Sequence, residues 1–406
     1  MTDGDKPAGN HIRVPYAMTV HDEEEVEAVV HVLRTSTQMG KHAREFERGI
    51  ADAYSKQHGI LVNSGSSALF LGMEALGLPA KAEVITPALT FATTVGCIVR
   101  NGLTPAFVDV GPRDYVADAD QVEAMINSRT VAMVIPNLMG NLPDWDRLAD
   151  LAATHGLRIV EDSADVIGAT YKGRRLGSYS DLTMTSFYGM HMINCAGNGG
   201  MVCVNDDRLA DRIRLLRSWG RSSTRFVDSE SIENRFNVDL DGIPYDAKFV
   251  FEEIGYNLEG SELGAAFGLV QLRKLPAVIE KRRAISEAQM RFFGRYAEWL
   301  ELPQMNRDAD SVWFAFPMIV KEQAPFSRRD LQIFFEQRNI QTRVVFTGNI
   351  TRQPGFRSIE MRKHPAGLPN ADRVMERGLL IAAHHGLDAE MLAHIHQSFE
   401  DFAVRF

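Results

Sequence analysis

Three stretches of the sequence combine residues that could hold an anion or move a proton. The first, "NSGSSAL" at residues 63–69, follows a strand-like run and opens a helix-like one. Free N–H groups at a helix N-terminus, bare Gly65 and the hydroxyl of Ser66 would together form a phosphate cradle. The same letters would serve equally well as an ordinary helix N-cap. Taken alone, the stretch leaves both interpretations open.

The second stretch is "LRIVEDSAD", which places Asp162 just past the end of a buried strand. Ligands bind at the carboxyl ends of strands in open α/β sheets. The Asp162 carboxylate could cap the next turn, or it could hold the ring nitrogen of a pyridoxal cofactor and keep that ring cationic. Phe91, in "TPALTFATT", also follows a strand. Its ring could belong to the core or could stack on a flat cofactor.

The third stretch is "SFYGMHMINCAGNGG", residues 186–200, which reads as a strand end, a turn and a glycine-rich hairpin. His191 stands in its turn, five residues after Ser186. An imidazole with an ordinary pKa near 6.5 is suited to proton transfer at neutral pH. The alternative is a structural histidine in a protein without catalysis.

The surrounding pattern indicates how these stretches are positioned. Short β-rich runs alternate with helical patterns over about residues 45–220, which predicts a largely parallel sheet with helices on both faces. Residues 221–250 are polar and aperiodic, and they could be a surface loop or an ordered arm near an active site or subunit interface. A long helix follows, and we place a domain boundary within it. The sequence therefore predicts a large domain over residues 1–274 and a small α+β domain over residues 275–406.

Composition excludes several classes of protein. The chain has 406 residues and a net charge of −9, with acidic and basic residues interspersed, so we expect no nucleic-acid partner. The N-terminal "MTDGDKPAGN" is polar, and no apolar run approaches the roughly 18 residues of a membrane span, so we expect no membrane association. The three cysteines show no CxxC spacing. These features favour a cytoplasmic protein without structural disulfides.

The order of the motifs carries more information than any one of them. The phosphate turn, the aromatic, the strand-end aspartate and the serine before a reactive position follow one another as in the PLP enzymes of fold type I. More narrowly, the chain resembles the DegT-type (StrS-like) sugar-nucleotide aminotransferases. The matching stretches include "MGKHAREFERGIADAY", "NSGSSAL", "TPALTFATT", "EDSADVIGATYKGRRLGSYSD", "SFYGMH", "GYNLEGSELGAAFGLVQLRKL" and "HPAGLPNADRVMERGLLI". The resemblance implies an aspartate-aminotransferase-like α/β fold that binds pyridoxal or pyridoxamine phosphate.

The residue at position 191 separates this chain from most of that family. The family normally has a lysine there, which binds the cofactor covalently, whereas this chain has His191. The substitution resembles a small branch of 3-dehydratases acting on 4-keto-6-deoxy sugar nucleotides, and the sequence looks closest to the GDP-linked enzyme of colitose formation. Another type in that branch carries an iron–sulfur cluster. Such a cluster needs four thiolates, and a chain with three cysteines excludes it within one subunit.

The resemblance also implies a reaction. The amine form of the cofactor condenses with the 4-keto group, His191 removes a proton from the cofactor, and the 3-hydroxyl of the sugar leaves. Hydrolysis then yields a 3,6-dideoxy-4-keto sugar, ammonia and pyridoxal phosphate. An amino donor, expected to be glutamate, restores the amine form. A lysine at position 191 would instead favour release of an amino sugar.

Further roles follow from the resemblance residue by residue. Gly65, Ser66 and Ser186 would hold the phosphate, and Asp165 would lie near the 3′-oxygen of the ring. Asn257 of "GYN" would reach the phosphate of the neighbouring subunit, which implies a homodimer with shared active sites.

The substrate contacts are less defined by the sequence. Candidates for the diphosphate are Arg343, Arg352 and His364, each of which could equally be a solvated surface group. Met190 and Asn198 depart from the family pattern close to the reactive position. Two other functions remain open: an aminotransferase that uses a lysine from elsewhere, such as Lys172 or Lys248, and a non-catalytic PLP-binding protein.

Overall fold

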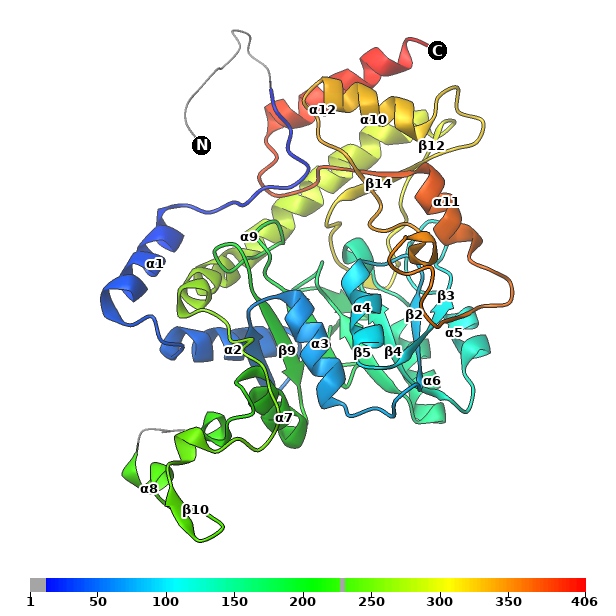
Figure 1. The fold of residues 1–406 in the computed structure, drawn as a ribbon. Coiled ribbons are helices and arrows are strands. Elements are labelled where there is room, and N and C mark those ends of the chain that lie inside the picture. Colours follow the sequence, from blue (N-terminus) through cyan, green and yellow to red (C-terminus); the bar gives the residue numbers. More distant parts are fainter. Residues whose placement is uncertain (1–11, 227–230) are drawn as a thin grey trace.

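The computed structural model describes residues 12–226 and 231–406, so the polar N-terminal decapeptide lies outside the described residues. A large sheet and a smaller one are joined by the long helix α9, Glu262–Phe293 (Figure 1). The mixed α/β fold with a mainly parallel large sheet confirms the predicted fold class.

The large sheet has eight strands in the order β1-β9-β8-β5-β4-β2-β3-β16. Their bounds are β1 His58–Val62, β2 Glu83–Pro87, β3 Thr104–Val108, β4 Thr130–Pro136, β5 Arg158–Asp162, β8 Leu182–Ser186, β9 Gly200–Val204 and β16 Arg362–Lys363. The pairs from β8 to β16 are parallel, whereas β9 runs antiparallel to both β8 and β1. The hairpin expected after Ser186 is therefore the turn from β8 into β9.

Alternation along the strands produces two apolar layers, one on each face of this sheet. Val84 and Val134 face a core packed under α3, α4 and α7, and their neighbours Ile85 and Ile135 face a core packed under α2, α5 and α6. These helices span α2 Lys41–Ala53, α3 Gly65–Ala75, α4 Ala92–Arg100, α5 Ala119–Met125, α6 Trp145–His155 and α7 Asp207–Arg217. Strands buried on both faces are continuous hydrophobic runs, as parallel sheets require.

The smaller sheet has the order β12-β14-β17-β15 and packs against α10, α12 and the second half of α9. The bounds are β12 Leu300–Glu301, β14 Phe316–Val320, β15 Arg343–Val344, β17 Gly378–Ile381, α10 Arg328–Gln337, α11 Pro369–Arg377 and α12 Ala389–Ala403. Within α9, Leu275 packs into the core of the large domain and Ile285 into the core of the small one. A division at residue 275 stays a prediction.

The described residues between 221 and 257 form an arm that contains short helices and strands. The arm contains α8, Ile232–Arg235, and a two-stranded hairpin of β10, Val238–Leu240, with β11, Ile243–Tyr245. Figure 1 shows α8 and β10 standing away from the rest of the molecule. Several large apolar side chains of the arm are exposed, among them Phe236, Ile243 and Ile254.

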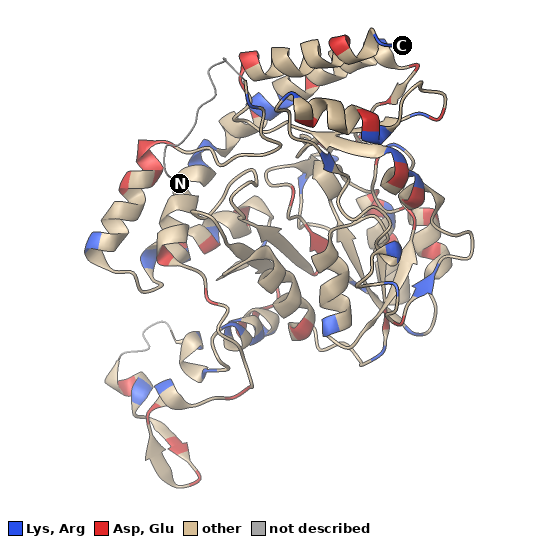
Figure 2. Cartoon of the chain, turned by 45° about the horizontal axis from the view of Figure 1, so that its top comes forward, with Lys and Arg blue, Asp and Glu red and all other residues tan. Residues whose placement is uncertain are grey.

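Acidic and basic residues are interspersed along the chain (Figure 2). A small sheet has the order β13-β6-β7, in which β6, Thr170–Tyr171, pairs on one side with β7, Arg174–Arg175, and on the other with β13, Ala309–Asp310. Across the described ranges, no helix combines the length and apolarity that crossing a bilayer requires. Cys97, Cys195 and Cys203 are all buried free thiols.

Candidate active site

A cavity of about 500 Å³ opens where the carboxyl ends of β5 and β8 meet the N-terminus of α3. It is also lined by Tyr16 from the N-terminal segment and by Phe314 and Arg343 from the C-terminal part of the chain. This is the position at which open α/β sheets bind ligands, because the strand ends leave a crevice there. Segments far apart in sequence therefore complete one site.

The first wall of the cavity is the beginning of α3. Ser64 caps the helix by accepting a hydrogen bond from the N–H of Ser67 at 3.1 Å, and Gly65 and Ser66 form the first turn. A Cβ at Gly65 would lie 2.5 Å from the Cβ of Ser186, so only glycine allows β8 to approach this closely. The helix N-terminus, Ser66 and Ser186 thus lie together on the cavity surface, where the free N–H groups favour an anion.

Asp162 forms the second polar feature, at the end of β5. Its carboxylate accepts hydrogen bonds from the hydroxyl of Thr94 at 2.8 Å and from the N–H of Ala164 at 3.2 Å. Burial raises the pKa of Asp162, while these two hydrogen bonds oppose that rise. Such a carboxylate gains stability from a cationic partner placed in the cavity. Phe91, the N-cap of α4, is 56% exposed and offers a free ring surface to the same cavity.

His191 lies in the turn after β8 and faces the cavity. Its Nδ1 is 3.1 Å from the carbonyl oxygen of Ser186, and a carbonyl only accepts, so Nδ1 carries the proton. Burial lowers the pKa of His191 to about 4, against the opposing effect of the backbone of Ser186 and Ala164. The imidazole is therefore neutral at pH 7 and able to accept a proton.

Asp165 is the second carboxylate of the cavity, and one of its oxygens accepts a hydrogen bond from the N–H of Met139 at 2.9 Å. Burial raises the pKa of Asp165 to about 7, and the nearby charge of Asp162 acts in the same direction. Burial thus raises the pKa of both aspartates and lowers that of the histidine in one cavity, a pattern typical of functional sites.

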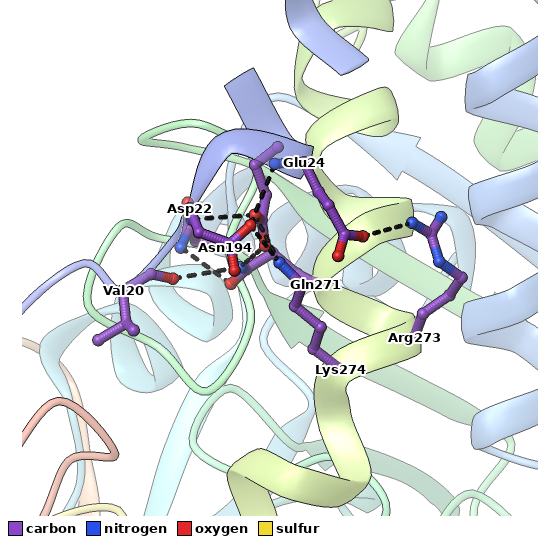
Figure 3. A network of polar contacts seen from close by, with 8 residues as sticks. Val20, Asp22, Glu24, Asn194, Gln271, Arg273 and Lys274 are labelled. Carbon is purple, nitrogen blue, oxygen red and sulfur yellow. Dashed lines mark hydrogen bonds and ion pairs between the residues drawn. The ribbon is translucent and has the colours of Figure 1, made fainter. Parts of the chain in front are cut away.

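A buried polar network fixes the loop that carries His191 (Figure 3). Asn194 donates to the side chain of Gln271 on α9, and Gln271 donates to Glu25 at 2.6 Å and to the Val20 carbonyl at 3.2 Å. Glu25 belongs to α1, Glu23–Thr35, and is fully buried. Hydrogen bonds thus connect the loop through Gln271 of α9 to the N-terminal segment.

Comparison with known proteins decides the family. The DegT/DnrJ/EryC1/StrS aminotransferase family matches residues 19–400. This chain belongs to that family. It is similar, at 36% identity over 96% of this chain and 86% of the relative, to a dTDP-4-dehydro-2,6-dideoxy-D-glucose 3-dehydratase of Saccharopolyspora spinosa. It is 29% identical, over 82% of this chain and 84% of the relative, to a GDP-perosamine synthase of Caulobacter vibrioides.

Among solved structures, a GDP-4-keto-6-deoxy-D-mannose 3-dehydratase of E. coli with bound hydrated PLP has a TM-score of 0.86. It is 24% identical and covers 96% of this chain and 100% of its own, which establishes that the two chains share one fold. The family predicted from the motifs is confirmed.

The cavity fits the cofactor expected for a DegT-family enzyme. The α3 N-terminus with Ser66 and Ser186 suits a phosphate, Asp162 suits a protonated ring nitrogen, and Phe91 suits the face of a flat ring. Within the described ranges, no group of three or more histidine, cysteine or acidic side chains could hold a metal ion.

Most of the predicted site residues meet in this one cavity. Those that line it are Gly65, Ser66, Phe91, Asp162, Asp165, Ser186, His191 and Arg343, together with Met190 and Asn198. Three lie outside it. Arg352 forms a two-point ion pair with Asp372 at 2.5 and 2.7 Å, and His364 accepts the N–H of Ala366 at 3.2 Å. Asn257 is exposed at the base of the arm, bridged to Ser218.

Several residues of the site had no signal in the sequence. Tyr16, Phe314 and Phe346 line the cavity, but each comes from a segment far from the motifs. The hydrogen-bonded pair of Thr90 and Thr94 also lines the cavity, and it could have been predicted because both residues lie in the stretch around Phe91. A search for hydroxyls one helical turn apart beside a strand end would have found them.

Proposed function

We propose that this DegT-family chain is a PLP- and PMP-dependent 3-dehydratase of an NDP-4-keto-6-deoxyhexose, which removes the oxygen at C3 of the sugar. One observation carries the proposal. The cavity presents His191 at the position where the family has lysine, and no lysine is among the described residues that line it. An imidazole can move protons but cannot bind the cofactor covalently.

In this proposal, residues of the cavity bind the cofactor, bind the substrate or transfer a proton. The α3 N-terminus, Ser66 and Ser186 bind the cofactor phosphate, and Asp162 orients the ring and stabilises its positive charge. The bound cofactor supplies an amine for the 4-keto group and a sink for the electrons released when the C3–O bond breaks. His191 accepts and returns a proton at Nε2, while the Ser186 carbonyl holds its Nδ1–H. Arg343, exposed at the cavity and 5.4 Å from the ring of Tyr16, would contact the substrate diphosphate.

The 3-dehydratase from Saccharopolyspora spinosa supports this assignment, and the GDP-perosamine synthase keeps an aminotransferase as the second candidate. The two lysines considered for that role give the second candidate little support. Lys172 is paired with Asp146 at 2.6 Å on the surface, and Lys248 lies on the arm; neither lines the cavity of its own chain.

A homodimer with shared sites is part of the proposal. Asn257 is exposed and lies outside the cavity of its own chain, at the base of an arm with exposed apolar side chains. A second copy that covers the arm would bury these side chains and could receive Asn257 at its cofactor phosphate. The amino donor in this proposal is glutamate.

Turnover of a panel of 4-keto-6-deoxy sugar nucleotides tests the proposal directly. The protein is incubated with PLP and glutamate, and the sugar products are weighed by mass spectrometry. A dehydratase yields a product that has lost the oxygen of C3. A product that keeps this oxygen and gains an amine would identify an aminotransferase, and no turnover across the panel would favour a non-catalytic role.

The mode of cofactor binding gives a second test. Borohydride reduces the imine between PLP and a lysine to a secondary amine, which leaves the cofactor permanently attached to the chain. We expect the intact mass of the PLP-loaded wild-type chain to be unchanged after this treatment. A cofactor adduct on any lysine of the active protein would contradict the proposal.

A further inference from the structure

Arg282 is a buried charge that the proposed chemistry leaves unexplained. It lies on α9, its side chain is only 1% exposed, and it stands behind the cavity wall rather than on it. A buried guanidinium is costly unless it is paired. No carboxylate among the described residues comes within 4.0 Å of Arg282, although the neighbouring Arg283 pairs with Asp310 at the surface. Burial lowers the pKa of Arg282 to about 10.

The hydrogen bonds of Arg282 go to the backbone of the cavity wall instead. Its Nη1 donates to the Phe314 carbonyl at 2.9 Å and, more weakly, to the Ala383 carbonyl at 3.5 Å. The guanidinium carbon lies 5.7 Å from the centre of the Phe314 ring. The same ring stands at 78° to the imidazole of His191, with ring centres 5.4 Å apart. Phe314 therefore neighbours both Arg282 and His191.

A second connection runs from Phe314 to Asp165. The Phe314 N–H donates to the Met139 carbonyl at 2.7 Å, and the Met139 N–H donates to the Asp165 carboxylate at 2.9 Å. The two segments are in close contact, since a Cβ at Gly140 would lie 2.1 Å from the Val312 carbonyl oxygen. A displacement of Phe314 would therefore be felt at Asp165 as well as at His191.

From this geometry we propose that Arg282 is a positioning residue, which holds Phe314 against His191 and, through Phe314 and Met139, holds Asp165 in the cavity. The inference concerns the same site as the proposed function, and its effect on turnover rests on that function. The placement of the His191 ring can be measured without any turnover.

The charge of Arg282 acts on the same groups. It opposes protonation of His191 and favours the carboxylate form of Asp165, although burial has the larger effect on both pKa values. The other titratable groups around Arg282 are Tyr16 on the N-terminal segment, His384 and His385 after β17, and Lys281 on α9. Burial also lowers the pKa of both of these histidines, so they are neutral at pH 7.

The experiment follows the imidazole of His191 by NMR in the full-length, histidine-labelled chain as purified. The His191 signal is assigned by its loss in His191→Gln. Its ring protons report the position of the Phe314 ring through the ring current. Arg282→Met should displace these signals and raise the midpoint of the His191 titration by about one unit, because a nearby positive charge is removed. Arg282→Lys keeps the charge but loses the hydrogen-bonding fork, so it should displace the signals while the midpoint stays near its wild-type value.

Arg217→Met is the matched control. Arg217 is a buried arginine on α7 that pairs with Glu47 at 3.0 Å and is not among the residues that line the cavity. Its loss should lower stability and leave the His191 signals in place. If turnover is established, both Arg282 variants should lower kcat about tenfold with little change in KM for the sugar, since a positioning residue acts on the reacting groups rather than on substrate binding.

Three results would overturn the inference. The first is His191 signals at their wild-type positions in both Arg282 variants. The second is an equal displacement in Arg217→Met, which would indicate a general loss of packing. The third is a failure of both Arg282 variants to fold while Arg217→Met folds, which would give Arg282 a purely structural role. A chain without turnover on any sugar nucleotide would contradict the proposed function and leave the NMR comparison valid.

Discussion

The cavity and the arm differ in which kind of side chain is buried and which is exposed. In the cavity, Asp162 and Asp165 are buried polar groups with defined partners, held by a sheet that is packed on both faces. In the arm, Phe236, Ile243 and Ile254 are apolar and exposed, the last by 96%. Polar groups inside and apolar groups outside both cost free energy in an isolated chain. Under the proposed function, a cofactor binds in the cavity and a second subunit covers the arm.

The largest effect on kcat should come from replacing His191, the base of the cavity. His191→Gln keeps the size of the side chain and removes the proton acceptor, so kcat should fall by about 10²–10⁴-fold. The affinity for PLP, measured by fluorescence titration, should change little, because the phosphate and ring contacts remain. His155→Gln, at an exposed position on α6, is the control. Activity within a few-fold of wild type in His191→Gln would remove His191 from the reaction.

The second largest effect concerns the arm, and it should appear as recovered activity in mixed dimers. Inactive His191→Ala chains and inactive Asn257→Ala chains are mixed under conditions that exchange subunits. In a mixed dimer, one of the two cavities has both residues intact, so part of the activity should return. An absence of recovery in proven mixed dimers would mean that Asn257 does not serve the partner's site.

The apolar surface of the arm gives a smaller and more graded effect. Ile254→Asp places a charge where we expect a second subunit to pack, and it should raise the dissociation constant of the dimer at least about tenfold, a cost of about 1.4 kcal/mol. Sedimentation velocity across a concentration series measures this. Phe406→Ser, which alters an exposed aromatic at the C-terminus, should leave the association unchanged. Equal dissociation in both variants would show that the arm is not the interface.

In the protein without cofactor, the buried carboxylate of Asp165 should lower the free energy of unfolding by a measurable amount. The pKa of Asp165 is about 7 in the folded chain and has an ordinary value of 3.8. Between these values, the folded chain keeps a proton that the unfolded chain has released, so stability falls as pH rises through this window and the cost is complete above pH 7. Asp165→Asn should therefore raise the free energy of unfolding by about 2–4 kcal/mol at pH 8 and by much less at pH 4.5.

Urea denaturation of the cofactor-free protein at the two pH values measures this difference. Asp310→Asn, at an exposed carboxylate, is the control and should change stability little at either pH. A gain that is the same at pH 4.5 and pH 8 would show that its origin is packing rather than the charge of Asp165.

The sequence was most informative where chemistry follows a strand end. Gly65, Asp162 and His191 each lie at the end of a strand or a few residues beyond it, and the sheet brings such positions to one edge whatever the details of packing. The turn after Ser186 was predicted for the same reason, since a glycine-rich hairpin is a local signal.

Residues that reach the site through tertiary packing were not predictable in this way. Tyr16 and Phe314 come to the cavity from more than a hundred positions away from His191, and no local periodicity marks them. The partner of Arg352 was likewise not predictable. The sequence left open whether this arginine contacts the substrate diphosphate, and in the fold it pairs with the carboxylate of Asp372. Charge pairing of this kind depends on the arrangement of η5, Ile350–Arg352, and α11 in space.

The central claim is that the residue at position 191 decides the fate of the sugar. The most direct test is the mass of the sugar-nucleotide product formed by His191→Lys with PLP and an amino donor. A lysine can bind the cofactor and displace the sugar as an amine before the 3-hydroxyl is lost. We predict a detectable 4-amino sugar that retains the oxygen at C3. A variant whose new lysine demonstrably binds the cofactor, but whose only product still lacks that oxygen, would contradict the claim and assign the outcome to the shape of the cavity.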